Sequence, residues 1–93
     1  MNEVIWTEQA LAHLQAIREY IEQFNPQAAS HVAHALKAAG DGLAHFPRRG
    51  RPVPKTGFRE LVTAYRYIVR YYVDENKIVI LRVRHMAQRP TDP

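Results

Sequence analysis

Apolar residues recur at intervals of three and four through the first half of the chain, which predicts two amphipathic helices. A strand-like stretch, EVIW at residues 3–6, comes first, and Thr7 then offers a hydroxyl that suits a helix cap. Asn25 and Pro26 suit the cap and first position of a second helix, so the two helices are expected to form an antiparallel hairpin. The predicted buried stripes are Ala10, Leu14, Ile17, Ile21 and Phe24 in the first helix, and Ala29, Val32, Leu36, Ala39, Leu43 and Phe46 in the second.

Two glycines, Gly40 and Gly42, interrupt the pattern near the end of the second helix. Each glycine weakens a helix by about 1 kcal/mol relative to alanine. Either the last turn of this helix is weak, or the glycines mark a place where a neighbouring element packs closely.

The second half of the chain predicts a basic loop followed by three strands. Residues 47–57, PRRGRPVPKTG, contain too many prolines and glycines for a regular element. Strand-like runs follow at 58–64, 65–73 and 77–85, the last two joined by Asp74-Glu75-Asn76. This order of elements predicts one α+β domain over residues 1–93, in which the helical hairpin packs on a small antiparallel sheet (β-α-α-β-β-β).

The register of the last two strands decides which side chains share a face of the sheet. A three-residue loop places Tyr65 opposite His85 and turns Arg66 away. A loop with an even number of residues instead predicts three pairs: Arg66 with His85, Arg70 with Leu81, and Tyr72 with Val79.

Charge is divided unevenly between the two halves. Residues 1–46 contain two basic and five acidic residues, whereas residues 47–93 contain eleven basic and four acidic residues, so the halves carry about −3 and +7. The basic half is expected to face an anionic partner, either nucleic acid or an acidic protein segment. A solvated basic surface without a partner is the simpler alternative.

Composition excludes several classes of site. The chain contains no cysteine, which excludes disulfides and thiolate metal sites. His31 and His34 lie three residues apart, but nothing nearby completes a coordination shell, so we expect no metal and no cofactor. His13 and His45 are expected at the surface or at helix ends. No signal peptide and no apolar run of the ~20 residues that span a bilayer are seen, so we expect a cytoplasmic protein without membrane contact.

His85 closes the last apolar strand and has two interpretations. A histidine titrates near neutral pH and could act as a general acid or base. It could equally end the strand by hydrogen bonding to the backbone. The residues alone leave both interpretations open.

Two stretches of the second half resemble a known family. Gly57-Phe58-Arg59-Glu60-Leu61 and LRVRHMAQRP at 81–90, in this order behind a helical hairpin, resemble the RelE/ParE superfamily of bacterial toxins from type II toxin-antitoxin systems. The resemblance extends from Val4 to Pro90. It implies a toxin that is neutralised by a cognate antitoxin, whose disordered segment folds over it. Operator DNA is then contacted only indirectly, through the antitoxin.

The superfamily includes two activities, so the resemblance leaves open whether this protein is an enzyme. RelE-like members cut messenger RNA in the ribosomal A site, whereas ParE-like members inhibit DNA gyrase. For a ribosome-dependent endoribonuclease, the resemblance implies that Arg59 and Arg66 hold the phosphate and that His85 is the acid or base. Glu60 is then a possible second proton-transfer group.

The end of the chain favours the gyrase inhibitor slightly. Met86 stands where several ribosome-dependent members have a tyrosine, and HMAQRP resembles the ParE-like and plasmid-stabilisation branch. In that case the residues expected to bind the target or partner are Arg82, Arg84, Gln88 and Arg89.

Overall fold

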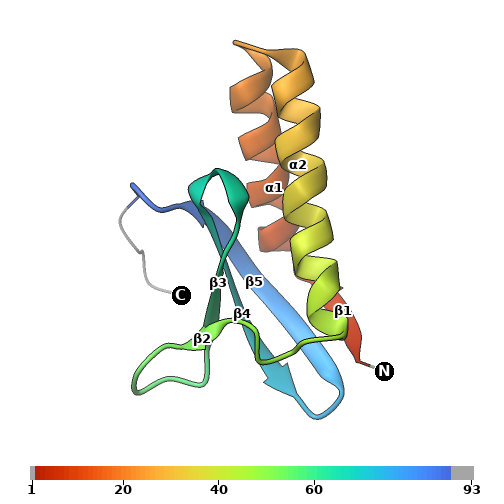
Figure 1. Ribbon diagram of the computed structural model, residues 1–93, viewed down its shortest axis with the longest axis vertical. Coiled ribbons are helices and arrows are strands. Elements are labelled where there is room, and N and C mark those ends of the chain that lie inside the picture. The colour runs from red at the N-terminus through yellow and green to blue at the C-terminus, as the bar shows by residue number, and fades with distance from the viewer. Residues whose placement is uncertain (1, 89–93) are drawn as a thin grey trace.

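Two helices cover one face of a five-stranded sheet in the computed structural model, which describes residues 2–88 (Figure 1). The elements are β1 (Glu3–Trp6), α1 (Glu8–Glu22), α2 (Pro26–Asp41), β2 (Arg51–Pro52), β3 (Arg59–Val62), β4 (Tyr67–Asp74) and β5 (Lys77–His85), with 3-10 turns at Gly42–Ala44 and Ala64–Arg66. The predicted α+β class and its helical hairpin are confirmed.

Both helices begin at the predicted caps. The Thr7 hydroxyl accepts a hydrogen bond from the Ala10 N–H at 3.1 Å, and the Asn25 side-chain oxygen accepts one from the Ala28 N–H at 3.1 Å. Each cap satisfies a backbone donor that has no partner within the helix. Local sequence therefore determines where each helix starts.

The predicted apolar stripes form the core, except at their ends. Phe24 is 72% exposed and Phe46 is 63% exposed, so their predicted burial is wrong. Both residues lie beyond the last residue of a helix, where helical spacing no longer sets their direction, and the tip of the hairpin projects past the sheet (Figure 1). The buried core comprises Ala10, Val32, Leu36, Leu43, Leu61, Val69, Tyr71, Ile78, Ile80 and Val83. The stripe residues Leu14, Ile17, Ile21 and Ala39 are partly buried and pack against it.

The two glycines of the second helix have different surroundings. A Cβ atom at Gly40 would lie 2.4 Å from Cζ2 of Trp6 and 2.8 Å from Cδ1 of Ile80. A Cβ atom at Gly42 would have no neighbour within 4 Å. Close packing therefore explains Gly40 alone, because α2 crosses β1 and β5 there.

The sheet has the order β1-β5-β4-β3-β2 and is mixed rather than wholly antiparallel. β1 pairs parallel with β5, while the remaining neighbours pair antiparallel. β2 lies within the stretch that was expected to be irregular, where Arg51 and Pro52 pair with Glu60 and Arg59. So short an edge strand has no sequence pattern by which it could be predicted.

A β-bulge changes the register of the β4–β5 hairpin. The loop contains two residues, Glu75 and Asn76, and Tyr72 lies opposite Val79 as an even loop predicts. The register then shifts by one residue, because Arg70 pairs with Arg82 and leaves Leu81 without a partner residue on β4.

The bulge makes two predicted pairs wrong. Arg70 does not lie opposite Leu81, and Tyr67 rather than Arg66 lies opposite His85. Arg66 instead ends the 3-10 turn between β3 and β4, with a positive φ of 66°, so the strand expected to begin at residue 65 begins at Tyr67.

Candidate functional site

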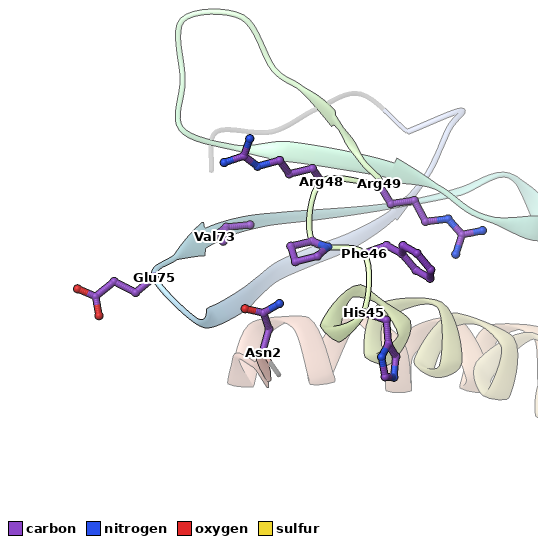
Figure 2. Close-up of a pocket in the computed structure, with 8 residues that line it drawn as sticks. Asn2, His45, Phe46, Arg48, Arg49, Val73 and Glu75 are labelled. Atoms are coloured by element: carbon purple, nitrogen blue, oxygen red, sulfur yellow. The ribbon is translucent and has the colours of Figure 1, made fainter.

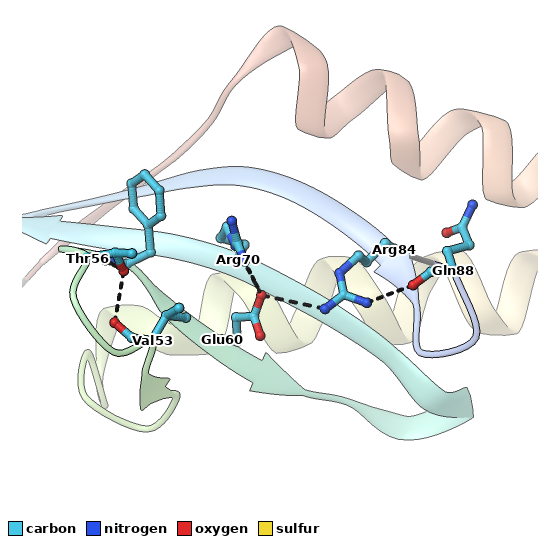
Figure 3. A network of polar contacts seen from close by, with 7 residues as sticks. Val53, Thr56, Glu60, Arg70, Arg84 and Gln88 are labelled. Atoms are coloured by element: carbon cyan, nitrogen blue, oxygen red, sulfur yellow. Dashed lines mark hydrogen bonds and ion pairs between the residues drawn. The ribbon is translucent and has the colours of Figure 1, made fainter. Parts of the chain in front are cut away.

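Three charged side chains from adjacent strands meet on the face of the sheet opposite the helices, here called the helix-free face (Figure 3). Nε and Nη2 of Arg70 donate hydrogen bonds to Oε2 of Glu60 at 3.0 and 2.8 Å. Nη2 of Arg84 lies 3.7 Å from the same oxygen. The three side chains are only 13–15% exposed, so the ion pairs are largely shielded from water.

Alternation along the strands places this network. Leu61, Val69 and Val83 point into the core beneath the helices, so the residues beside them point the other way. Cross-strand pairing of Glu60 with Arg70, and of Arg70 with Arg82, brings the charges together. Arg82 is 5% exposed.

Arg84 has spare hydrogen-bonding capacity. Its Nη1 donates to the carbonyl oxygen of Gln88 at 3.1 Å, but its Nε is buried and has no hydrogen-bond partner among residues 2–88. A buried donor without a partner is costly, and an anionic acceptor would satisfy it.

Aromatic rings border the network. The Arg70 guanidinium lies 5.5 Å from the centre of the Phe58 ring, and Phe58 lies 6.5 Å from the ring of Tyr72. Guanidinium groups beside aromatic rings suit either a carboxylate-bearing protein surface or a phosphate with an adjacent base.

Arg59 lies outside this network and donates hydrogen bonds to the loop that precedes β2. It pairs with Tyr71, whose side chain is in the core, so Arg59 points toward the side of the sheet that carries the helices. Its Nη1 donates to the carbonyl oxygen of Gly50 at 2.7 Å and, more weakly, to that of Arg48 at 3.4 Å. The guanidinium that was expected to hold phosphate is therefore engaged by backbone oxygens.

His85 makes the backbone contacts that the strand-end interpretation predicts. Its Nδ1 accepts a hydrogen bond from the Ala87 N–H at 3.1 Å, and its own N–H donates to Oε1 of Gln88 at 2.9 Å. The ring meets Tyr67 edge to face at 5.0 Å. A pocket of about 580 Å³ lies beside it, lined by Ala16, Ile17, Tyr20, Tyr67, His85 and Gln88.

The four residues expected to catalyse RNA cleavage are not brought together. Among residues 2–88, no hydrogen bond or ion pair joins any two of Arg59, Glu60, Arg66 and His85. Glu60 lies on the helix-free face, whereas Arg59 and His85 point toward the opposite side at positions separated by roughly 13 Å along β4. The Arg66 carbonyl accepts a hydrogen bond from the Met86 N–H at 2.8 Å.

Three of the four residues expected to bind a partner lie near one another, along and just after the last part of β5. Arg82 and Arg84 point to the helix-free face, and Gln88 is exposed just after β5. Arg89 lies outside the described residues. Sequence reasoning missed the pairing of Arg70 with Glu60. Arg70 lies between Val69 and Tyr71, a pattern that marks opposite faces of a strand, whereas Glu60 follows Arg59 and carries no such signal.

The prediction that His13 is a surface or helix-end residue is wrong. Its Nδ1 accepts a hydrogen bond from the Val83 N–H at 3.3 Å, on the part of β5 that extends past β1. Burial, and secondarily the charge of Arg82, lower the pKa of His13.

No metal site or membrane span is found in the described part of the chain. His31 and His34 are exposed, and residues 2–88 contain no group of three or more histidine, aspartate or glutamate side chains arranged to hold a metal ion. No helix within these residues is long and apolar enough to cross a membrane.

Comparison with known proteins places these features in context. A family model described as “ParE toxin of type II toxin-antitoxin system, parDE” matches residues 4–90. Toxin RelE2 of Caulobacter vibrioides is 50% identical over 88 residues, which cover 95% of this chain and 99% of that protein. Putative toxin Y4kP of Sinorhizobium fredii is 40% identical over 85 residues, which cover 90% of this chain and 88% of that protein.

Solved structures show the same architecture. A chain of the chromosomal ParDE toxin-antitoxin system from P. aeruginosa matches with a TM-score of 0.81 and 25% identity, over 91% of this chain and 96% of that one. The conserved hypothetical protein HP0894 from Helicobacter pylori matches in fold, with a TM-score of 0.53 and 14% identity over 89% of this chain and 92% of that one.

Proposed function

Because this chain belongs to the ParE toxin family of type II toxin-antitoxin systems, we propose that it inhibits DNA gyrase by binding to it. A toxin of this kind has a cognate antitoxin as its partner. We further propose that residues 1–93 act as one toxin domain in the cytoplasm, where gyrase acts, and reach operator DNA only through the antitoxin.

The observation that carries this proposal is the separation of the four candidate catalytic groups. General acid-base cleavage requires its groups within hydrogen-bond reach, about 2.6–3.2 Å, of one reacting centre. Here Arg59 holds loop carbonyls and Glu60 holds Arg70, on opposite faces of the sheet. Inhibition by binding requires no such convergence.

We propose that Arg84 and Gln88 contact the target near the end of β5. Gln88 is exposed, and Arg84 has a free donor at Nε within the described residues. Arg82 is 5% exposed and is proposed to support this surface from beneath rather than to contact the target.

Purified toxin should block supercoiling by gyrase. His85→Ala should inhibit within about threefold of the wild-type concentration, because among residues 2–88 the ring hydrogen-bonds to the nearby Ala87 N–H and otherwise packs on Tyr67. Arg84→Gln should inhibit at least about tenfold less well, as expected for loss of a central interface arginine. Normal supercoiling by gyrase at a saturating concentration of toxin would disprove this proposal.

The alternative is a RelE-like, ribosome-dependent endoribonuclease. It is favoured by the arginines of the helix-free face, by the unpartnered Nε of Arg84 and by the adjacent rings of Phe58 and Tyr72, which together suit a phosphate and a base. This alternative predicts message cut inside codons at the ribosomal A site, with cleavage lost in Arg84→Gln or His85→Ala. Supercoiling and translation measured in one expressing culture separate the two targets.

A further inference from the structure

The loop from His45 to Gly50 presents an aromatic ring and two arginines beside a pocket of about 770 Å³ (Figure 2). Phe46 is 63% exposed and Val73 is 37% exposed, and both line this pocket. Arg48 extends on the side of Val73, whereas Arg49 and Phe46 extend to the other side of the loop (Figure 2). We call Phe46, Arg48, Arg49 and Val73 the loop surface.

Buried hydrogen bonds hold this loop in place. The hydroxyl of Tyr71, a fully buried residue, donates to the carbonyl oxygen of Pro47 at 2.7 Å and accepts from the Gly50 N–H at 2.9 Å. Nη1 of Arg59 donates to the carbonyl oxygen of Gly50 at 2.7 Å. Tyr71 packs so closely that a Cβ at Gly50 would lie 2.8 Å from its ring. The exposed side chains are therefore presented from a fixed backbone, which lowers the entropic cost of binding.

The charges of the loop surface are available to a partner. Within the described residues, neither Arg48 nor Arg49 forms an ion pair, and Glu75 is the acidic residue that lines the pocket. Arg49 also lines a smaller groove of about 210 Å³ between α2 and β3, next to Val62, which is exposed. Apolar surface thus lies on both sides of an unpaired arginine.

We propose that the loop surface docks an acidic segment of the cognate antitoxin, with apolar side chains over Phe46 and over Val73 and carboxylates on Arg48 and Arg49. The complementary charge follows from the two unpaired guanidinium groups, and the apolar floor suits a protein side chain better than a phosphate backbone. A partner that must hold the toxin continuously gains most from a preorganised surface. This inference rests on membership of a toxin-antitoxin family and not on the identity of the target.

The test measures the Kd between the toxin and its cognate antitoxin. Phe46→Ala and Arg49→Glu should each raise the Kd about tenfold or more, as expected for central interface residues. Two controls match them: Phe24→Ala removes a similarly exposed ring from the hairpin tip, and Lys55→Glu makes the same change in net charge on an exposed residue. Both controls should leave the Kd within about threefold of wild type.

Circular dichroism and thermal melting of each variant establish that the fold is retained, and the same variants are assayed for inhibition of supercoiling. A raised Kd for Phe46→Ala and Arg49→Glu, with controls unchanged, supports the docking surface whether or not wild-type toxin inhibits gyrase. An unchanged Kd overturns it. Unchanged Kd together with lost inhibition of supercoiling would overturn it as well and would assign the surface to the target.

Discussion

At the scale of single residues, the chemical type of a side chain does not determine its structural role. Arg59 has the charge expected of a phosphate ligand, yet its guanidinium holds the carbonyl oxygen of Gly50. Tyr71 looks like one of several strand aromatics, yet it is fully buried and bonds both Pro47 and Gly50. Burial is the main cause that raises the pKa of Tyr71. The partners lie 9 to 24 residues away, so local sequence does not reveal them.

His13 should make stability depend on pH. Its pKa is lowered from the ordinary value of 6.5, because burial and then Arg82 disfavour the charged ring. Below 6.5 the unfolded state binds a proton more readily than the folded state, so the free energy of unfolding falls as pH falls toward the folded pKa. Protonation also removes the acceptor that holds the Val83 N–H.

Urea unfolding of wild type and His13→Gln at about pH 7.5 and about pH 5 measures this contribution. Glutamine keeps an acceptor but does not titrate, and the other histidines are common to both proteins. Wild type should lose more stability than His13→Gln on acidification. Equal losses of stability in the two proteins would show that the pKa of His13 is not lowered by folding.

At the scale of elements, the bulge in β5 decides which side chains face the helices. Past the bulge, Val83 and His85 point toward the helices and Arg82 and Arg84 point to the helix-free face. If Leu81 instead paired regularly with Arg70, this alternation would reverse and aim both arginines at the core. One residue in the strand thus separates the apolar and the cationic faces.

Packing of α2 on the sheet makes a second prediction. Gly40→Ala should destabilise the protein, because its Cβ would overlap Trp6, whose Nε1 is held by the Asp41 carboxylate at 3.0 Å. Overpacking costs about 1–3 kcal/mol, against the ~1 kcal/mol gained in helix propensity. Gly42→Ala is the matched control and should stabilise by about 0.5 kcal/mol, since nothing lies near its Cβ. The midpoints of urea unfolding, at an unchanged dependence of the free energy on urea, measure the stability of both variants. Equal changes in stability for Gly40→Ala and Gly42→Ala would contradict this prediction.

At the scale of the whole molecule, the charge asymmetry predicts that association depends on salt. The C-terminal half carries about +7, and its exposed arginines attract an acidic partner before contact. Raising salt from about 0.05 to about 0.5 M should lower the rate constant for antitoxin association about tenfold, while dissociation changes less. Stopped-flow or surface-based kinetics measures both rates. An association rate independent of salt would show that the basic half does not steer the partner.

What the sequence determines by itself is local: both helix caps, the hairpin between them, the final pair of strands and the excess of positive charge in the second half. Each depends on residues within a few positions of one another, so spacing and residue type suffice. Motif resemblance likewise identifies the family, because its residues recur in order along the chain.

Tertiary structure decides what those residues do. The bulge at Leu81 separates Arg66 from His85. Glu60 accepts hydrogen bonds from Arg70, and Arg59 donates to the carbonyl oxygen of Gly50 in the loop that presents Phe46. These outcomes depend on register and on contacts between distant segments. A shift of one residue in a strand reverses every later side chain, which is the physical reason that the arrangement of the site could not be predicted although its residues could be named.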